Sequence, residues 1–448
     1  RPLGMYHVYT SVWFSAIYLL LLISLIGCIV PRIVSHAKAL RRQPPRVPAR
    51  LDRLAAHASM ITSASAAEVS QRAQQWLTSH RYRFVVDDDG SLRAEAGRHR
   101  ETGNLVFHIF LVFVLVGVGW NTLWGFKGTS VVVEGQGFSN SITQYDEFKA
   151  GAMVDTDNLT PFSMKLRKFV VSFETGTVQR GAARSFDATV DLTMGGKTQT
   201  RDLQVNHPLR IGSTKVHLLG HGYAADVVVR DGDGKVAYSG PVVFLPQDAN
   251  FKSVGVIKVP DARPDRLAFQ GFFLPTGAIT AGGPTSLFPD ALNPQLYLTA
   301  WYGKPTVETG VPSNIYTLDT TGLTQVTNGK DKARFVLSPG QRYKLPDGKG
   351  SIQFNGWQRW AKIQVSQNPG LPLTFLSVVL SVAGLCVSLF SRSRRVWVRT
   401  IPGDDGLRVE IGGLDRSDSR SGAVDDVNSL LAALHGDSMS GDVGEEHS

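Results

Sequence analysis

The stretch that decides the fold lies between Leu105 and Trp124 and reads LVFHIFLVFVLVGVGWNTLW. It is almost unbroken apolar sequence, and at about 1.5 Å per residue it is long enough to cross the hydrocarbon core of a bilayer. One ionisable side chain, His108, lies inside it. Because an ionisable group is costly to place within a membrane, His108 is a candidate functional residue. The alternative is that His108 lies at the membrane interface, where it only hydrogen-bonds a neighbouring helix.

Two further apolar blocks predict two more transmembrane helices. Residues 12–30 read VWFSAIYLLLLISLIGCIV, with Pro31 expected to end the helix, and residues 371–390 read LPLTFLSVVLSVAGLCVSLF. Arginines cluster directly after each block, and dense Lys and Arg beside a span marks the cytoplasmic side. The chain is therefore expected to cross the membrane from outside to inside, back to outside, and again to inside, over residues 1–31, 104–125 and 371–391.

The segments on the cytoplasmic side differ in kind. Residues 32–103 begin with a linker rich in Pro and Arg, RRQPPRVPARLDRL, which is expected to be extended and either to lie along anionic headgroups or only to fix the topology. A short amphipathic helix and a hairpin around DDDG follow, so we expect a small α+β element. Residues 392–448 end in a stretch rich in Gly, Ser and Asp, which predicts a largely disordered tail with one short helix in VNSLLAALHG.

Residues 126–370 alternate β-branched and polar side chains and contain hairpin turns such as DGDG and MGGK. The pattern predicts a large extracytoplasmic domain of antiparallel β structure, in one or two sandwich-like layers. The fold class is therefore an α+β membrane protein with three visible transmembrane helices and a large antiparallel β domain outside the cell.

Two cysteines, Cys28 and Cys386, both fall within apolar blocks, so no disulfide framework is expected, and CxxC and CxxCH are absent. The expected topology places both of them and His108 in the inner leaflet. A neutral imidazole and a thiolate are suited to ligate a haem iron between helices. The alternative for each cysteine is a small buried hydrophobic residue, and the role of Cys386 stays open.

Outside the membrane, His217 and His221 form HLLGH. The spacing suits two metal ligands on one face of a helix, but the Glu of HExxH is missing and the surroundings predict a strand. Two loop or strand histidines are therefore favoured over a zinc site. No GxSxG or Walker A motif occurs, so we expect no catalytic residues, and basic residues are not interleaved with aromatics as a nucleic-acid surface would require.

Several segments resemble the ResB (CcsB) family of system II cytochrome c biogenesis, over nearly the whole chain to about Arg399. They are LLLLISLIGCIVPRIVSHAKALRRQPPR, RETGNLVFHIFLVFVLVGVGWNTLWGFKGTSVVVEGQGF, HLLGHGYAADVVVRDGDGKVAYSGPVVFLPQD and IQVSQNPGLPLTFLSVVLSVAGLCVSLFSRSRRVWVR. The resemblance implies a multi-pass protein of the bacterial cytoplasmic membrane. It would deliver haem b across the membrane and assist its covalent attachment to apocytochrome c, as part of a holocytochrome c synthase complex and not as an enzyme alone.

The resemblance also implies partners and site residues. The partners are a ResC/CcsA-type haem-handling membrane protein, apocytochrome c and a thioredoxin-like thiol reductase. His108 matches the family's membrane histidine, an axial haem ligand, and Cys28 matches a cysteine of less settled role that is a candidate haem contact. Family members carry one more transmembrane helix before the first one seen here, so we expect a truncated or mis-started sequence. The resemblance further implies a Trp-rich haem-handling loop on the partner. This chain has no such loop, so the site where haem is attached is expected on the partner.

Two other functions stay open on the residues alone. One is a membrane-anchored receptor or scaffold whose β domain binds a ligand and which carries no haem. The other is a metalloenzyme that uses His217 and His221, which would contain zinc.

Overall fold

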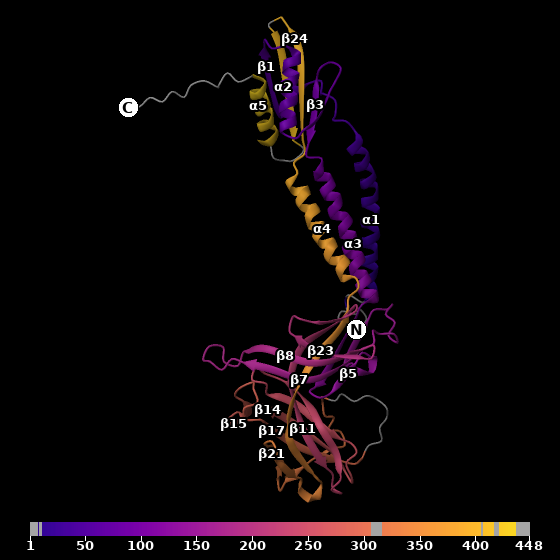
Figure 1. Cartoon of the computed structure of the whole chain (residues 1–448), viewed down its shortest axis with the longest axis vertical. Helices are drawn as coiled ribbons and strands as arrows, with labels where there is room; N and C mark the ends of the chain where they lie inside the picture. Colours follow the sequence, from indigo (N-terminus) through magenta and orange to yellow (C-terminus); the bar gives the residue numbers. More distant parts are fainter. Residues whose placement is uncertain (1–7, 9–10, 306–315, 405, 416–420, 436–448) are drawn as a thin grey trace, which may run out of the picture. The chain divides into compact units, whose positions relative to one another are not determined.

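The computed structural model describes residue 8 and residues 11–305, 316–404, 406–415 and 421–435. Its chain divides into two compact units, which are described separately. One comprises Arg1–Trp120 together with Gly370–Ser448, and the other comprises Asn121–Pro369. Figure 1 shows the elements of both units in the colours of the sequence.

Three helices of the first unit are long and apolar enough to cross a membrane: α1 (Val12–Arg41), α3 (His99–Trp124) and α4 (Leu371–Phe390). The expectation that Pro31 ends the first helix is wrong, because α1 continues for ten residues beyond it. A proline inside a helix removes only the hydrogen bond from its own nitrogen, here to the carbonyl of Gly27, and a long membrane helix tolerates this loss.

Helices α3 and α4 approach each other closely through small residues. A Cβ atom added at Gly103 would lie 2.6 Å from the Gly384 carbonyl oxygen, and one added at Gly384 would lie 2.7 Å from the Phe107 nitrogen. The hydroxyl of the buried Ser381 donates to the Phe107 carbonyl at 3.3 Å. Close backbone approach of this kind drives helix association where no water is available to be displaced.

Helix α1 packs against α3 in the antiparallel direction. The Tyr18 hydroxyl donates to the Leu115 carbonyl, the Arg32 guanidinium pairs with Glu101 at 2.9 Å, and His36 hydrogen-bonds Thr102. Tyr18 and Arg32 are fourteen residues apart, as are Leu115 and Glu101. The two helices therefore keep one register over about four turns.

The first unit also holds a small domain built from both ends of the chain. Its five-stranded antiparallel sheet has the order β1-β25-β24-β3-β2, and in Figure 1 the late, orange to yellow strands lie between dark early ones. The elements are η2 (Leu51–Arg53), β1 (Ala56–Thr62), α2 (Ala66–Ser79), β2 (Arg83–Val86), β3 (Leu92–Ala96), β24 (Arg394–Gly403), β25 (Gly406–Asp415) and α5 (Ser421–His435).

The early part of this domain follows its local sequence. Ser65 caps α2 in a reciprocal capping box with Glu68, and the apolar stripe that includes Val69 and Leu77 is buried. β2 and β3 form a hairpin around the DDDG turn, as the sequence predicts.

The described part of residues 392–448 differs from the disordered tail that its composition predicts. β24 and β25 form a hairpin that inserts between β1 and β3. Val398 and Ile411 alternate with polar side chains and are buried in a core shared with Leu92 and Leu77. The high Gly, Ser and Asp content of the whole segment dominates its composition, although β24 and β25 each alternate apolar and polar residues. Their partner strands lie some 300 residues earlier in the sequence.

The linker after α1 lies against this sheet. Its backbone carbonyls accept hydrogen bonds from side chains of the sheet: Pro44 from Arg93 at 3.2 Å, and Pro45 from Trp397 at 3.0 Å. Further along, Arg399 donates to the Ala49 carbonyl at 3.2 Å. The linker is extended, as expected. An extended proline-rich backbone makes no internal hydrogen bonds, so its carbonyls can accept from the side chains of the sheet.

The second unit is the large antiparallel β domain that the sequence predicts. Its main twelve-stranded sheet follows the order β18-β17-β14-β13-β12-β11-β23-β4-β6, with β10, β21 and β22 paired off this path, and a four-stranded sheet has the order β5-β7-β8-β9. The strands are β4 (Phe126–Val133), β5 (Gly137–Ser139), β6 (Glu147–Ala150), β7 (Ser163–Phe173), β8 (Ala183–Met194), β9 (Lys197–Gln204), β10 (Leu209–Ile211), β11 (Thr214–Arg230), β12 (Val236–Pro246), β13 (Ser253–Val259), β14 (Arg266–Leu274), β15 (Gly277–Thr280), β16 (Gly283–Ser286), β17 (Gln295–Gly303), β18 (Thr324–Gln325), β19 (Thr327–Asn328), β20 (Asp331–Lys332), β21 (Arg334–Leu337), β22 (Arg342–Lys344) and β23 (Ser351–Gln367), with single turns η3 (Ile142–Gln144) and η4 (Pro346–Gly348).

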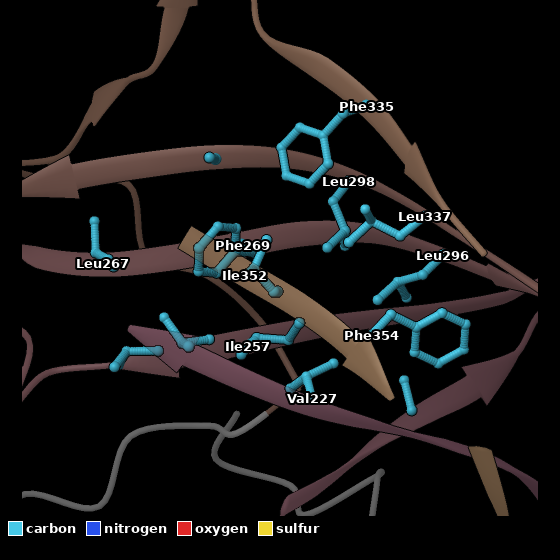
Figure 2. Packing of buried hydrophobic residues seen from close by; sticks show 14 of the residues in the cluster. Val227, Ile257, Leu267, Phe269, Leu296, Leu298, Phe335, Leu337, Ile352 and Phe354 are labelled. Atoms are coloured by element: carbon cyan, nitrogen blue, oxygen red, sulfur yellow. The ribbon is translucent and has the colours of Figure 1, made fainter. Parts of the chain in front are cut away.

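Two long paired strands, β11 and β23, join two hydrophobic cores within this unit. The first core contains Phe269, Leu298 and Phe354, which extend from different strands into a shared interior in Figure 2. The second contains Phe169 and Ile363. β-bulges in the β11–β23 pair fall at Leu218/Gly220 and at Asp226/Val227, and such bulges let one strand change its twist as it passes from one core to the next.

Gly103→Ala and Gly384→Ala are expected to destabilise the α3–α4 pair by about 1–3 kcal/mol each, because the new methyl group overlaps backbone atoms that cannot move aside. Gly27→Ala on α1 is the matched control, since a Cβ there meets nothing within 4 Å. The measurement is thermal unfolding of the purified chain in detergent. Equal melting of all three variants would contradict the close packing.

Candidate functional site

His108 lies on α3 with one ring nitrogen already committed. Its Nδ1 atom is 2.7 Å from the Asn104 carbonyl oxygen, one turn earlier in the same helix. A carbonyl oxygen can only accept a hydrogen bond, so Nδ1 carries the proton and the neutral ring keeps its lone pair on Nε2. No partner for Nε2 occurs in the described part of the chain. This is the tautomer that a metal-ligating histidine needs.

The register of α1 and α3 places His108 on the α1 side of its helix. Glu101, His108 and Leu115 follow one another at intervals of seven residues, which is close to two full turns. The outer two contact Arg32 and Tyr18 of α1, so His108 lies midway between these contacts. Its ring is half-buried and meets the Phe107 ring edge to face, with 4.9 Å between centroids.

Cys28 lies near this level but its side chain faces elsewhere. In the α1–α3 register Cys28 is level with Leu105, one turn from His108. The packed stripe of α1 passes through Leu25 and the buried Ile29, while Cys28 beside it is exposed. Cys386 of α4 is also exposed, and both cysteines are free thiols.

His36 of α1 is a histidine at a contact between helices that the sequence reasoning missed. Its Nε2 atom lies 3.0 Å from the Thr102 hydroxyl of α3. The reasoning overlooked it because Pro31 was expected to end the helix. The packed stripe Leu22, Leu25, Ile29 would have found it, since the same spacing continued past the proline reaches residue 36.

The described residues contain no group of three or more His, Cys, Asp or Glu side chains placed to hold a metal ion. His217 and His221 belong to strand β11, so the helical spacing that would bring them together does not apply. Four residues of strand separate two positions by about 13 Å. The strand assignment favoured by the sequence is confirmed, and the two histidines lie apart along it.

His221 has an unusual environment within the β domain. It keeps only 9% of its exposure and stacks on Phe251 at 4.7 Å, with Phe186 at 5.2 Å. Its Nδ1 atom is buried without a hydrogen-bond partner. Burial, and secondarily the charge of the nearby Arg359, lowers the pKa of His221 to about 4. His217 is only half-buried, and burial lowers its pKa as well.

Arg359 is itself buried beside this cluster. Its guanidinium pairs with Asp290 at 2.7 Å and lies 4.9 Å from the centre of the Tyr223 ring. These contacts explain how a cation is retained inside an aromatic core. We regard the cluster as part of the architecture of the β domain.

Three helices able to cross a membrane, a small α+β domain formed by both ends of the chain, and a large antiparallel β unit define a membrane protein that carries a β domain. The chain belongs to the ResB-like family, whose model matches residues 1–424.

Named relatives agree with this assignment. Cytochrome c biogenesis protein CcsB of Synechococcus sp. (strain JA-3-3Ab) is 23% identical over 397 residues, which cover 88% of this chain and 71% of that protein. The CcsB protein of Trichormus variabilis is 23% identical over 418 residues, covering 92% and 76%. That of Microcystis aeruginosa is 21% identical over 414 residues, covering 92% and 77%.

The buried His221 predicts a pH-dependent stability of the β domain. An unfolded histidine titrates near 6.5, whereas the folded one titrates near 4. As the pH falls through this window the unfolded chain takes up a proton that the folded domain does not, so the free energy of unfolding should fall by up to about 3 kcal/mol and then level off. The measurement is denaturant unfolding of the full chain, followed by tryptophan fluorescence.

The variant His221→Phe keeps an aromatic ring and removes the titration, so it should flatten the profile between pH 6.5 and pH 4. His207→Phe, at an exposed histidine of the same unit, is the control and should leave the profile unchanged. A profile that is the same in wild type and in His221→Phe would refute this reading of His221.

Proposed function

We propose that this chain is a subunit of the cytochrome c maturation machinery and that it delivers haem across the membrane through His108. Membership of the ResB-like family and the relatives named cytochrome c biogenesis protein CcsB support the role in maturation. The observation that carries the haem step is the hydrogen bond from His108 Nδ1 to the Asn104 carbonyl, which leaves Nε2 free.

Haem b is the cargo in this proposal, and its iron accepts a neutral imidazole as an axial ligand. His108 fits that role in three ways. Its tautomer is set by a backbone carbonyl, which no side-chain substitution can remove; its ring is half-buried among apolar side chains; and it stands on a helix that both α1 and α4 hold in place. Among the described residues His108 is the single histidine at this level of the helices, so we infer that the second axial ligand comes from another polypeptide.

The proposed partners are those that the resemblance to the ResB family implies. A ResC/CcsA-type membrane protein would supply the second ligand and the site where thioether bonds form, while a thioredoxin-like reductase would keep the apocytochrome cysteines reduced. The clusters of Arg after α1 and after α4 support a cytoplasmic location for the small domain, and hence an extracytoplasmic location for the β domain, in the bacterial cytoplasmic membrane. The β domain is then free to meet apocytochrome c.

The test is the haem content of the chain purified together with a ResC-type partner. His108→Ala should lower the haem bound per complex by at least about tenfold. Removing a residue that only hydrogen-bonds a metal ligand typically lowers metal affinity about 10–100-fold, and removing the ligand itself should lower it at least as much. The yield of holocytochrome c should fall with it. An absorption spectrum and cytochrome yield equal to wild type would overturn the role of His108.

Two variants serve as controls for this experiment. His36→Ala removes the histidine of α1, whose Nε2 is already engaged with Thr102, and should retain haem. Cys28→Ser should lower the haem content less than His108→Ala, because the Cys28 side chain lies off the packed stripe. A complex that lacks haem in wild type, with normal cytochrome c levels in a deletion strain, would favour a scaffold without haem.

A further inference from the structure

A polar cavity of about 990 Å³ lies where the three helices of the first unit meet the small domain. Its wall comes from the last turns of α1, the linker after it, the β3–α3 junction and the α4–β24 junction. Five arginines line it: Arg32, Arg42, Arg98, Arg100 and Arg395.

The charge of this cavity is not balanced. Among the described residues that line it, two carboxylates, Glu95 and Glu101, stand against five arginines. Glu101 pairs with Arg32 at 2.9 Å, and Glu95 pairs with Arg98 at 3.3 Å. Arg42 and Arg100 form no ion pair within the described residues and are exposed. Their charges are therefore available to a ligand.

The wall of the cavity is held in place by protein contacts. The Arg98 guanidinium donates to the Ala39 carbonyl at 2.8 Å, which ties the end of α1 to the β3–α3 junction. The His36–Thr102 hydrogen bond fixes α1 against α3 at the same level. The linker is fixed to the sheet through the carbonyls of Pro44 and Pro45. A ligand would thus meet an arrangement that is already formed, so little ordering is needed on binding.

The position of the cavity identifies the kind of ligand. It begins at Arg32 on α1, Asn104 on α3 and Ser388 on α4, which is where the apolar run of each helix gives way to polar sequence. For a helix that crosses a bilayer this is the headgroup level. The side chains that line the cavity are largely polar, with Ala39, Leu40 and Pro45 the main apolar ones. Such a wall suits phosphate groups and offers little to the apolar faces of a porphyrin.

We propose that this cavity binds the headgroup of an anionic phospholipid that carries two phosphates, such as diphosphatidylglycerol. Two phosphodiesters bring two negative charges, which match the two guanidinium groups of Arg42 and Arg100, and arginine binds phosphate oxygens in bidentate geometry. Basic pockets between membrane helices on the cytoplasmic side are suited to such lipids. The proposal rests on insertion of the helices in a membrane and not on the haem function of His108.

The test is a lipid titration of the full chain in mild detergent, with bound lipid counted by native mass spectrometry and its effect followed by thermal unfolding. Wild type should bind diphosphatidylglycerol at a concentration at least about tenfold below that needed for phosphatidylglycerol, which has one phosphate. The double variant Arg42→Gln/Arg100→Gln should weaken that binding by about tenfold or more, since each charge-assisted contact to phosphate contributes strongly in a partly enclosed site. Both side chains are exposed, so the variant should melt like wild type without lipid.

The matched control is Arg46→Gln/Arg50→Gln, which removes the same charge from exposed arginines of the same linker that do not line the cavity. It should bind the lipid as wild type does, and so should His108→Ala, which separates this proposal from the haem proposal. Equal weakening by both double variants would overturn the proposal in favour of a general basic surface. Saturation by inorganic phosphate alone, or displacement of the lipid by haemin in wild type, would overturn it in favour of a small anion or of haem carboxylates.

Discussion

The pairing of β3 with β24 is the constraint on which the first unit depends. β3 leads into α3 after only two residues, and β24 follows α4 after only three. The two strands are antiparallel and in register from Leu92–Val398 to Ala96–Arg394. The antiparallel helices α3 and α4 therefore continue a strand pair, and the register of the sheet sets the register of the helices. At the crossing point Gly97 is in the left-handed region, where a Cβ atom would lie 1.7 Å from the Arg392 carbonyl oxygen, so only glycine fits.

The small domain closes a loop that contains the entire β unit. Its strands come from residues 56–96 and 394–415, so the sheet is complete only after α4 has been made. The entropic cost of closing a loop grows slowly with its length, and a compact insert lowers it further. α5 then joins both halves, since Asp426 accepts from Tyr82 at 2.6 Å and pairs with Arg394 at 2.8 Å, and the Trp76 indole donates to Ser429. The early and late parts of this domain have no complete core without each other.

The sequence predicts the elements whose signal is local. The three helices, the α2 stripe that includes Val69 and Leu77, and the β2–β3 hairpin all follow from periodicity or turn chemistry. The late hairpin could not be predicted in this way, because β24 and β25 are stable only against β1 and β3, and composition reports nothing of distant partners. For α1, Pro31 was expected to end the helix. The helix continues past it, because proline removes one backbone hydrogen bond and the remaining ones keep the helix intact. At the site, the candidate histidine was visible as an ionisable residue in an apolar run, but its tautomer depends on a rotamer. The cavity depends on four segments that only the fold brings together.

Helix α3 carries His108 and also contributes Arg100 to the arginine-lined cavity, so the two sites have a fixed spacing along one helix. His108 lies eight residues beyond Arg100, so the two are about 12 Å apart along the axis and separated by little more than two turns. The apolar level holds a half-buried imidazole with a free nitrogen, whereas the polar level holds an excess of positive charge. A planar apolar cargo gains from the first, and a phosphate headgroup from the second, because burying charge without a counter-charge is costly. Since α3 is fixed to α1 by side-chain contacts and to α4 by backbone contact, neither level can shift without the other. A lipid bound in the cavity would therefore lie at a constant depth relative to the histidine.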